Sequence, residues 1–221
     1  MSPTPLPHAP APAHDAAPRP ALVAGAHATF LALLGNGRHL LEAGCGAGED
    51  LRLFRQQGLT VTAFDASRAQ AAAASRLCGQ PVRVCRFEQM QSVVPYDGIW
   101  ASGSLPCLTE DELVPALMHL AGLLKPQGPL YCSFPYGESE PASSLPPSQE
   151  EYPLLTRLDE ARLTQLITPL PFELHQSWCS QDAVHGRWLH ALLIRYPNPA
   201  TINQYRGRRS RQGARRDSAS R

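Results

Sequence analysis

The chain has 221 residues, a formal net charge of +1 and 43% hydrophobic residues, which suits one α/β domain with tails and a substantial core. It contains no run of about 18 apolar residues and no basic-then-apolar leader, so we expect neither a membrane span nor a secretion signal. The six cysteines are scattered and form no C-x-x-C pair. This pattern argues against a disulfide framework or a metal site and favours a cytoplasmic location.

Charge is distributed unevenly along the chain. Residues 200–221 hold seven Arg and one Asp, a charge of +6, which leaves −5 for the remainder. Because the part expected to fold is acidic overall, we do not expect it to bind nucleic acid. The Arg-rich tail over 198–221 is expected to be disordered. It is either a solubilising extension or an electrostatic tether to RNA or an acidic partner.

The first elements of the chain precede a glycine-rich loop. Residues 1–20 are mostly Pro, Ala and His, have little to bury and are expected to be a disordered tail before a domain over 21–197. The apolar spacing over 21–34 predicts a helix. The apolar run over 39–43 then predicts the first strand.

Three glycines at alternate positions follow that strand: Gly44, Gly46 and Gly48. An amphipathic segment over 49–57 follows at once and predicts a helix, with acids in its first turn where the helix dipole favours them. Such a loop lets a ligand approach closely, because glycine has no Cβ and the helix start offers free N–H groups. The dinucleotide fingerprint G-x-G-x-x-G requires a glycine where Glu49 stands, which argues against a nicotinamide-dependent oxidoreductase.

A second strand is predicted over 59–65 and ends in Asp65. An acid at the end of this strand, about 20 residues beyond the loop, can accept hydrogen bonds from both hydroxyls of an unmodified ribose. The sequence therefore indicates a site for a nucleoside without a pyrophosphate.

Helices and strands continue to alternate through the rest of the chain. The further expected elements are a helix over 67–78, strands over 81–86 and 96–101, a helix over 109–124, a strand over 130–134, a helix over 158–167, and strands over 172–178 and 187–196. Pro115 falls inside the 109–124 helix, where it would cost roughly 3 kcal/mol, so we expect a break near it.

Four motifs resemble those of the class I S-adenosylmethionine-dependent methyltransferases. These are Leu41–Gly48, Phe64–Ser67, Asp97–Ala101 and Leu124–Gly128. Within that family, the chain is most similar to the small bacterial methyltransferases of the tellurite-resistance type. The resemblance implies an α/β fold with a Rossmann-like, doubly wound, seven-stranded sheet, mostly parallel with an antiparallel C-terminal strand. It also implies S-adenosyl-L-methionine as the cofactor.

The resemblance assigns roles to individual cofactor-binding residues. The glycine loop would pack against the methionine portion, with Glu42 orienting it, while Asp65 takes the ribose hydroxyls and Ala66 flanks the adenine. Phe87 would lie beside the adenine or, equally, be plain core, and Ser102 would lie near the sulfonium. The expected cofactor set is Glu42, Gly44, Cys45, Gly46, Gly48, Asp65, Ala66, Phe87 and Ser102.

No catalytic residue follows from the sequence, because methyl transfer from a sulfonium needs mainly alignment of donor and acceptor. A general base helps only when the acceptor arrives protonated. Pro106 and Cys107 stand where related sequences often carry Leu and His, and we expect Cys107 to be a buried small residue. The residues expected to bound the acceptor cavity are Ser104, Tyr136 and His185. His190 is a further candidate, with a surface or satisfied core histidine as the alternative.

The segment over 135–156 is expected to be a long loop that is either functional or disordered, and the resemblance implies that a segment here covers the substrate. Related proteins carry basic residues there, whereas this chain has glutamates. A neutral or cationic small-molecule acceptor is therefore expected. Three functions remain open. The first is an active methyltransferase, favoured by the glycine loop and Asp65, and the second is a catalytically degenerate cofactor-binding regulator or scaffold, favoured by Pro106, Cys107 and the acidic loop. The third is a nicotinamide-dependent oxidoreductase, against which Glu49 argues.

Overall fold

The computed structural model describes residues 22–138, 155–182 and 186–197. The tails expected at 1–20 and 198–221, most of the 135–156 loop and His185 lie outside the described residues. Among the helices described, none is long and apolar enough to cross a membrane.

The described residues contain every helix and strand expected from the sequence, with shifted ends. The helices are α1 (Leu22–Leu34), α2 (Glu49–Gln56), α3 (Arg68–Cys78), α4 (Glu110–Leu123) and α5 (Glu160–Ile167). The strands are β1 (His39–Ala43), β2 (Thr60–Asp65), β3 (Arg83–Val84), β4 (Gly98–Ala101), β5 (Pro129–Pro135), β6 (Phe172–Asp182) and β7 (Gly186–Arg195). Two short 3-10 turns, η1 (Phe87–Gln89) and η2 (Leu105–Cys107), lie in the loops after β3 and β4.

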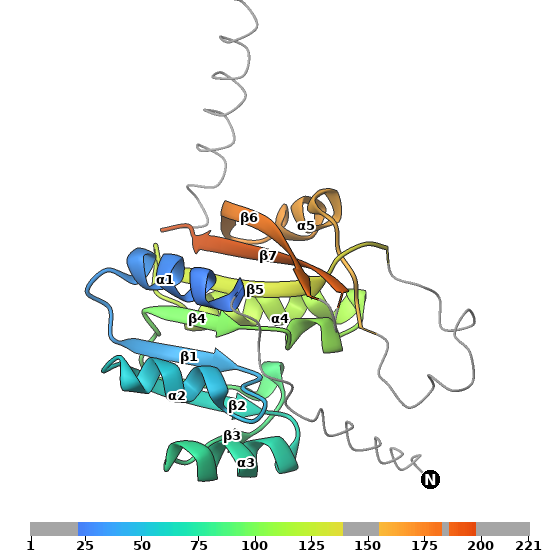
Figure 1. Cartoon of the computed structure of the whole chain (residues 1–221). Coiled ribbons are helices and arrows are strands. Elements are labelled where there is room, and N and C mark those ends of the chain that lie inside the picture. The colour runs from blue at the N-terminus through green and yellow to red at the C-terminus, as the bar shows by residue number, and fades with distance from the viewer. Residues whose placement is uncertain (1–21, 139–154, 183–185, 198–221) are drawn as a thin grey trace, which may run out of the picture.

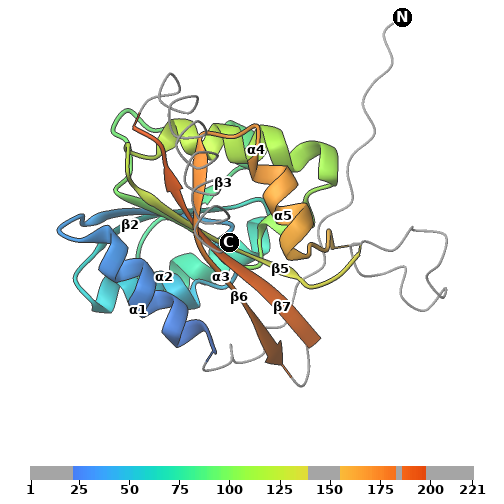
Figure 2. The ribbon, with the colours of Figure 1, turned by 90° about the horizontal axis from the view of Figure 1, so that it is seen from above.

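All seven strands form one sheet in the order β3-β2-β1-β4-β5-β7-β6. The pairs from β3 to β5 are parallel, whereas β7 runs antiparallel to both β5 and β6. Helices α1, α2 and α3 cover one face of the sheet, and α4 and α5 cover the other (Figures 1 and 2). The expected Rossmann-like fold class is confirmed.

The sheet is buried on both faces, as a mostly parallel sheet between helices requires. On the α1 side, the Trp100 and Tyr131 rings stack with centroids 3.8 Å apart. On the α4 side, Leu117 and Leu130 belong to a second apolar cluster and are fully buried. Two separate cores therefore fix the sheet, and its carboxyl edge is free to carry a site.

Helix α4 runs without a break through Pro115, so the expected interruption is wrong. The helix begins with a capping box in which the backbone N–H of Thr109 donates to Glu112 Oε2 at 2.9 Å. Pro115 points to solvent, while Leu113 and Leu117 on the other side of the helix are buried. Burial of that apolar side and the cap offset the one backbone hydrogen bond that proline removes.

Asp97 joins three segments at the amino edge of the sheet. The backbone N–H groups of Arg38 and His39 both donate to its Oδ2 at 2.8 Å, and Lys125 Nζ donates to Oδ1 at 2.6 Å. Burial raises the pKa of Asp97, but the bonds from Lys125 and the two amides outweigh it and lower the pKa overall. The carboxylate thus fixes the start of β1 against β4 and the end of α4.

Candidate functional site

The loop between β1 and α2 is built from glycines in the left-handed region, with φ of 73° at Gly44 and 91° at Gly48. A Cβ on Gly44 would lie 2.4 Å from Cβ of Ser104, and a Cβ on Gly48 would lie 2.8 Å from Cβ of Ala74. Both distances are too short for real atoms. These two glycines are therefore needed to pack the loop against the protein itself.

Gly46 has a different environment. Its φ is also positive, at 55°, but a Cβ placed there would meet no heavy atom of the described residues within 4 Å. Its backbone N–H donates to Oδ2 of Asp65 at 2.9 Å. The middle of the loop is thus an open cradle beside a carboxylate, where a ligand can contact the backbone directly.

Asp65 lies at the end of β2 and is held by two backbone donors. Gly46 donates to Oδ2, and the N–H of Ser67 donates to Oδ1 at 2.8 Å. A carboxylate has about four acceptor sites, so this partly exposed group can accept about two more hydrogen bonds from a ligand. The structure therefore brings the glycine loop and Asp65 into one site.

Two carboxyl groups lie close enough to the glycine loop to act on the Cys45 thiol. Burial raises the pKa of the Cys45 thiol, and the carboxylates of Glu42 and Asp65 raise it further. Burial and then Glu42 likewise raise the pKa of Cys78. Glu42 itself is only 2% exposed, at the end of β1 beneath the loop. Two acids acting on the same loop favour a ligand with positive charge.

The segment after β4 runs past the glycine loop. Ser104, expected at the acceptor cavity, lies against Gly44, and its hydroxyl donates to the carbonyl of Ala43 at 2.5 Å. Ser102 is partly exposed directly after the last residue of β4. These contacts fix the 102–104 segment beside the cradle.

The two residues expected beside the adenine lie in different environments. Phe87 is 8% exposed, and its ring packs edge-on against Phe64 with centroids 5.3 Å apart. Ala66 is exposed, one residue beyond Asp65. The contact with Phe64 matches the alternative in which Phe87 is a core residue. Ala66 is exposed to solvent at the carboxyl edge of the sheet.

Cys107 is exposed, so the expectation of a buried residue is wrong. In the short turn η2, Leu105 and Pro106 take the buried positions and leave Cys107 outward. The surrounding protein nevertheless raises the pKa of its thiol, and the Asp65 carboxylate adds to the increase. Cys107 is thus solvent-accessible and lies near enough to Asp65 for that carboxylate to act on its thiol.

Tyr136, the second residue expected at the acceptor cavity, packs against the apolar cluster on the α4 and α5 side of the sheet. Its hydroxyl donates to Glu160 Oε2 at 2.9 Å, and this bond raises its pKa. The guanidinium of Arg187 lies 3.7 Å above its ring. The structure thus places one positive charge beside Tyr136 that the acidic loop sequence did not indicate.

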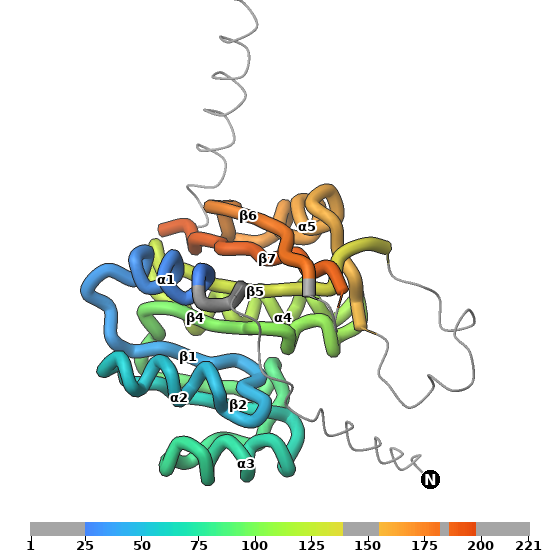
Figure 3. Tube along the Cα trace, in the orientation of Figure 1, coloured from blue at the N-terminus to red at the C-terminus, as the bar shows by residue number. Residues whose placement is uncertain are grey.

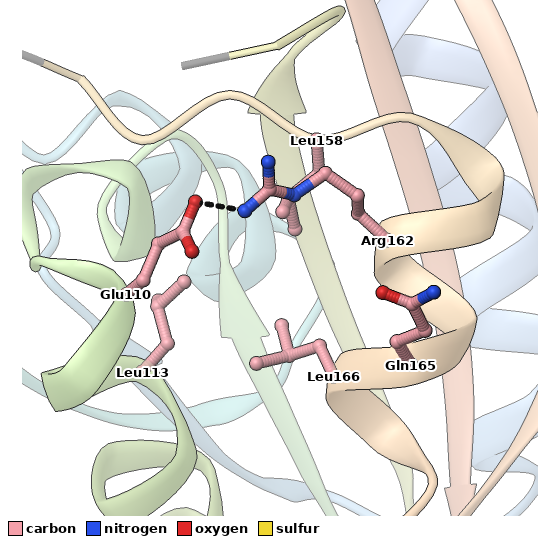
Figure 4. Close-up of a pocket in the computed structure, with 6 residues that line it drawn as sticks. All are labelled: Glu110, Leu113, Leu158, Arg162, Gln165 and Leu166. Atoms are coloured by element: carbon pink, nitrogen blue, oxygen red, sulfur yellow. Dashed lines mark hydrogen bonds and ion pairs between the residues drawn. The ribbon is translucent and has the colours of Figure 1, made fainter. Parts of the chain in front are cut away.

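A cavity of about 190 Å³ lies between α4 and α5 (Figure 4). Its lining residues are Glu110, Leu113, Leu158, Arg162, Gln165 and Leu166. The guanidinium of Arg162 donates to Glu110 across it. None of the expected cofactor residues lines this cavity, so it is separate from the cradle. Within the described ranges, no group of three or more His, Cys, Asp or Glu side chains could hold a metal ion.

Sequence reasoning missed a buried polar contact behind the glycine loop. Asp50, in the first turn of α2, is 1% exposed, and Trp100 Nε1–H donates to its Oδ2 at 2.8 Å. His27 Nε2 of α1 lies 3.2 Å from its Oδ1. Only the local signal, an acid at a helix start, was visible in the sequence, because both partners are more than twenty residues away. The contact fixes the helix that follows the cradle.

His190 is a satisfied core residue. Its Nδ1 lies 2.7 Å from the Tyr131 hydroxyl, and its Nε2 lies 2.7 Å from the Ser180 hydroxyl. Burial lowers its pKa to about 4, so the ring is neutral near pH 7. These contacts therefore match the expected alternative in which His190 is a satisfied core histidine.

Comparison with known proteins gives consistent results. Residues 41–130 match the sequence model of a family described as a methyltransferase domain. The fold is similar to that of 1,6-didemethyltoxoflavin-N1-methyltransferase from Burkholderia thailandensis, with 23% identity, a TM-score of 0.66, and 80% of this chain and 79% of that chain covered. No curated protein sequence matches the chain.

Two further solved structures share the fold. Magnesium protoporphyrin IX methyltransferase from Synechocystis PCC 6803, with bound S-adenosylhomocysteine, is 19% identical at a TM-score of 0.64, with 79% and 82% of the two chains covered. The CcbJ methyltransferase from Streptomyces caelestis is 16% identical at a TM-score of 0.63, with 80% and 97% covered.

The residues at the cradle fit an adenosyl cofactor. Gly46 leaves room that a Cβ would fill, and Asp65 retains acceptor sites. The cradle lies at the carboxyl ends of β1 and β2, next to the point between β1 and β4 where the order of strands reverses and ligands of open α/β sheets bind. With the match of residues 41–130 to a methyltransferase domain, these features indicate a site for S-adenosylmethionine on this domain.

Proposed function

We propose that this protein transfers a methyl group from S-adenosylmethionine to a small-molecule acceptor. The bound cofactor supplies an electrophilic methyl group on a sulfonium. The observation that supports the proposal most directly is the open space at Gly46 beside the Asp65 carboxylate. The protein binds and orients the two reactants and excludes water, which is what an in-line displacement requires.

Each cofactor residue has a role that its position supports. Asp65 accepts the ribose hydroxyls with the lone pairs that Gly46 and Ser67 leave free. Glu42, buried beneath the loop, would orient it and would place a carboxyl group near the sulfonium of the bound cofactor. Ser102, directly after β4, would border the methyl-donating end of the bound cofactor. No residue is assigned as a general base.

The acceptor class rests on the neighbours and on the sequence. Two methyltransferases of similar fold are named for the small molecules 1,6-didemethyltoxoflavin and magnesium protoporphyrin IX. A small molecule is therefore the proposed acceptor. Membership of the tellurite-resistance-type subgroup and a cytoplasmic location remain proposals from the sequence motifs and the cysteine pattern.

Calorimetric titration of the full chain with S-adenosylmethionine, S-adenosylhomocysteine and NAD tests the proposal. We expect both adenosyl ligands to bind and NAD to fail. Asp65→Ala should weaken S-adenosylhomocysteine by roughly 1–3 kcal/mol, because hydroxyls lose their acceptor. Glu173→Ala, an acid at the start of β6, is the matched control and should bind normally. Unchanged affinity in Asp65→Ala would remove that residue from the site.

The exposed Cys107 beside Pro106 supports a second candidate, a cofactor-binding regulator without catalysis. Methyl transfer to a panel of small-molecule acceptors separates the two functions. Tight binding of S-adenosylhomocysteine with no transfer to any acceptor would favour the regulator.

A further inference from the structure

The donor segment, residues 102–108, connects β4 to α4 at the carboxyl edge of the sheet. Its Ser104 packs where a Cβ on Gly44 would lie, and the Ser104 hydroxyl donates to the last carbonyl of β1 at 2.5 Å. Further along, burial raises the pKa of the Cys107 thiol, and the carboxylate of Asp65 raises it further. The donor segment therefore lies near both parts of the cradle, the glycine loop and the acid.

The start of the donor segment is fixed from β5, the strand that runs beside β4 (Figure 3). Gly103 has φ of 64°, in the left-handed region, and its backbone N–H donates to Oγ of Ser133 at 2.9 Å. Ser133 is buried in β5. Because Ser102 and Ser104 flank Gly103, this bond fixes the part of the segment that is proposed to border the methyl donor.

The end of the donor segment is fixed by Thr156, which precedes α5. Its backbone N–H donates to the carbonyl of Pro106 at 2.8 Å, and its hydroxyl donates to the carbonyl of Leu108 at 2.6 Å. Thr156 is buried, whereas Cys107, the residue between those two carbonyls, is exposed. A single residue thus bonds the chain on both sides of Cys107 and sets the orientation of the turn η2.

Both hydroxyl bonds act on the donor segment rather than on the core. Each joins a side chain to a backbone group of the segment, across 30 residues for Ser133 and 48 residues for Thr156. Neither bond belongs to the ladder of the sheet or to a helix. Removing one hydroxyl therefore releases one end of the segment and leaves the sheet and its two apolar clusters in place.

We propose that Ser133 and Thr156 are positioning residues for methyl transfer, which hold the donor segment in the arrangement that binds the cofactor. The inference rests on the proposed function and deepens it. Each side chain acts through the backbone that carries Ser102 and Cys107. A misplacement of about 1 Å is enough to slow a reaction that depends on the alignment of its two reactants.

Calorimetric titration of full-chain variants with S-adenosylhomocysteine tests the proposal. A segment that is in place for only part of the time lowers the apparent affinity in proportion. We expect Ser133→Ala and Thr156→Val each to bind about three- to tenfold more weakly, the factor to which the net contribution of one hydrogen bond corresponds. Thr156→Ser keeps the hydroxyl and should bind close to normally.

The control variant is Ser75→Ala. Oγ of Ser75, in α3, accepts the backbone N–H of Val82 at 3.0 Å, a bond of the same kind and nearly the same length as that of Ser133. Val82 lies just before β3, whose start is at the amino edge of the sheet. This variant should lose a similar amount of stability in urea unfolding and bind S-adenosylhomocysteine as the wild type does.

Alkylation of Cys107 by iodoacetamide, located by peptide mass spectrometry, reports on the donor segment independently. Saturating S-adenosylhomocysteine should slow this reaction in the wild-type chain. In the free protein, Thr156→Val should speed it by about the factor expected for binding, because the turn η2 is released at one end.

The outcomes separate this inference from the proposed function. If Ser133→Ala and Thr156→Val lose stability but bind S-adenosylhomocysteine normally, their role is structural only, and the inference fails while the methyltransferase proposal stands. If either variant does not fold, the wild-type alkylation decides, and a rate that the bound ligand leaves unchanged would overturn the inference. A wild-type chain that does not bind S-adenosylhomocysteine would overturn the proposed function itself.

Discussion

The variant Gly46→Ala, compared with Gly35→Ala, separates the stability lost to a strained backbone from the loss of cofactor binding. Gly46 has φ of 55° and open space where a Cβ would lie. Gly35, at the end of α1, has φ of 59° and equally open space. Because β1 lies between them in the chain, the two glycines are at opposite edges of the sheet. Gly35→Ala is therefore a control with the same strain and no contact with the cradle.

The magnitudes follow from the geometry. An alanine in the left-handed region costs about 1–2 kcal/mol, so both variants should lose that amount of stability. For a chain of this size the melting temperature should fall by about 2–8 °C. The new methyl at Gly46 occupies space beside the N–H that donates to Asp65. We expect S-adenosylhomocysteine to bind Gly46→Ala more than tenfold less tightly, which corresponds to at least about 1.4 kcal/mol.

Thermal unfolding with and without S-adenosylhomocysteine measures both effects in one experiment. A ligand that binds only the folded state raises the melting temperature with its concentration. Wild type and Gly35→Ala should show the same shift, and Gly46→Ala a much smaller one. Equal shifts in the two variants would show that the space at Gly46 is not where the cofactor lies, and the reasoning on the cradle would fail.

Two further predictions concern stability against pH, measured by urea unfolding. The bonds to Asp97 lower its folded pKa, so their contribution is present above the unfolded pKa and lost as the pH falls through the folded one. Asp97→Asn should therefore cost about 1–3 kcal/mol at pH 7 and little near about pH 2, and an equal cost at both would contradict this account. Burial lowers the pKa of His190 to about 4, so the unfolded chain takes up its proton first and stability falls between about pH 6.5 and 4. His190→Phe should flatten this decline, and an unchanged slope would refute the role of His190.

Local patterns predicted most of the fold. The 3.6-residue and two-residue periodicities located the helices and strands, and the capping pattern at Thr109 placed the start of α4 correctly. The expected break at Pro115 was wrong because the sequence does not show which face of α4 is exposed. Burial of the other face stabilises the helix enough to keep it continuous.

The cofactor side of the site was readable because its residues follow strand ends in a fixed order. Glycines after β1 and an acid after β2 meet wherever parallel strands are neighbours, and the contact between Gly46 and Asp65 is a direct result. The acceptor side was not readable in this way. Ser104 packs on the glycine loop, Tyr136 lies on the α4 side, and Cys107 turns outward. Their directions depend on turns and long-range packing, which leave no periodic signal.

The sequence by itself determined the alternation of elements, which depends on neighbours within one or two turns of chain. It also placed the glycine loop and Asp65 directly after two consecutive strands, whose parallel pairing brings them together. Only the tertiary structure decided that Asp50 is bound by Trp100 and approached by His27, and that Trp188 reaches Gly103 from the antiparallel strand β7. Those contacts join residues separated by tens of positions. They form because burial of apolar side chains on both faces of the sheet fixes which side chains of each segment point toward which face.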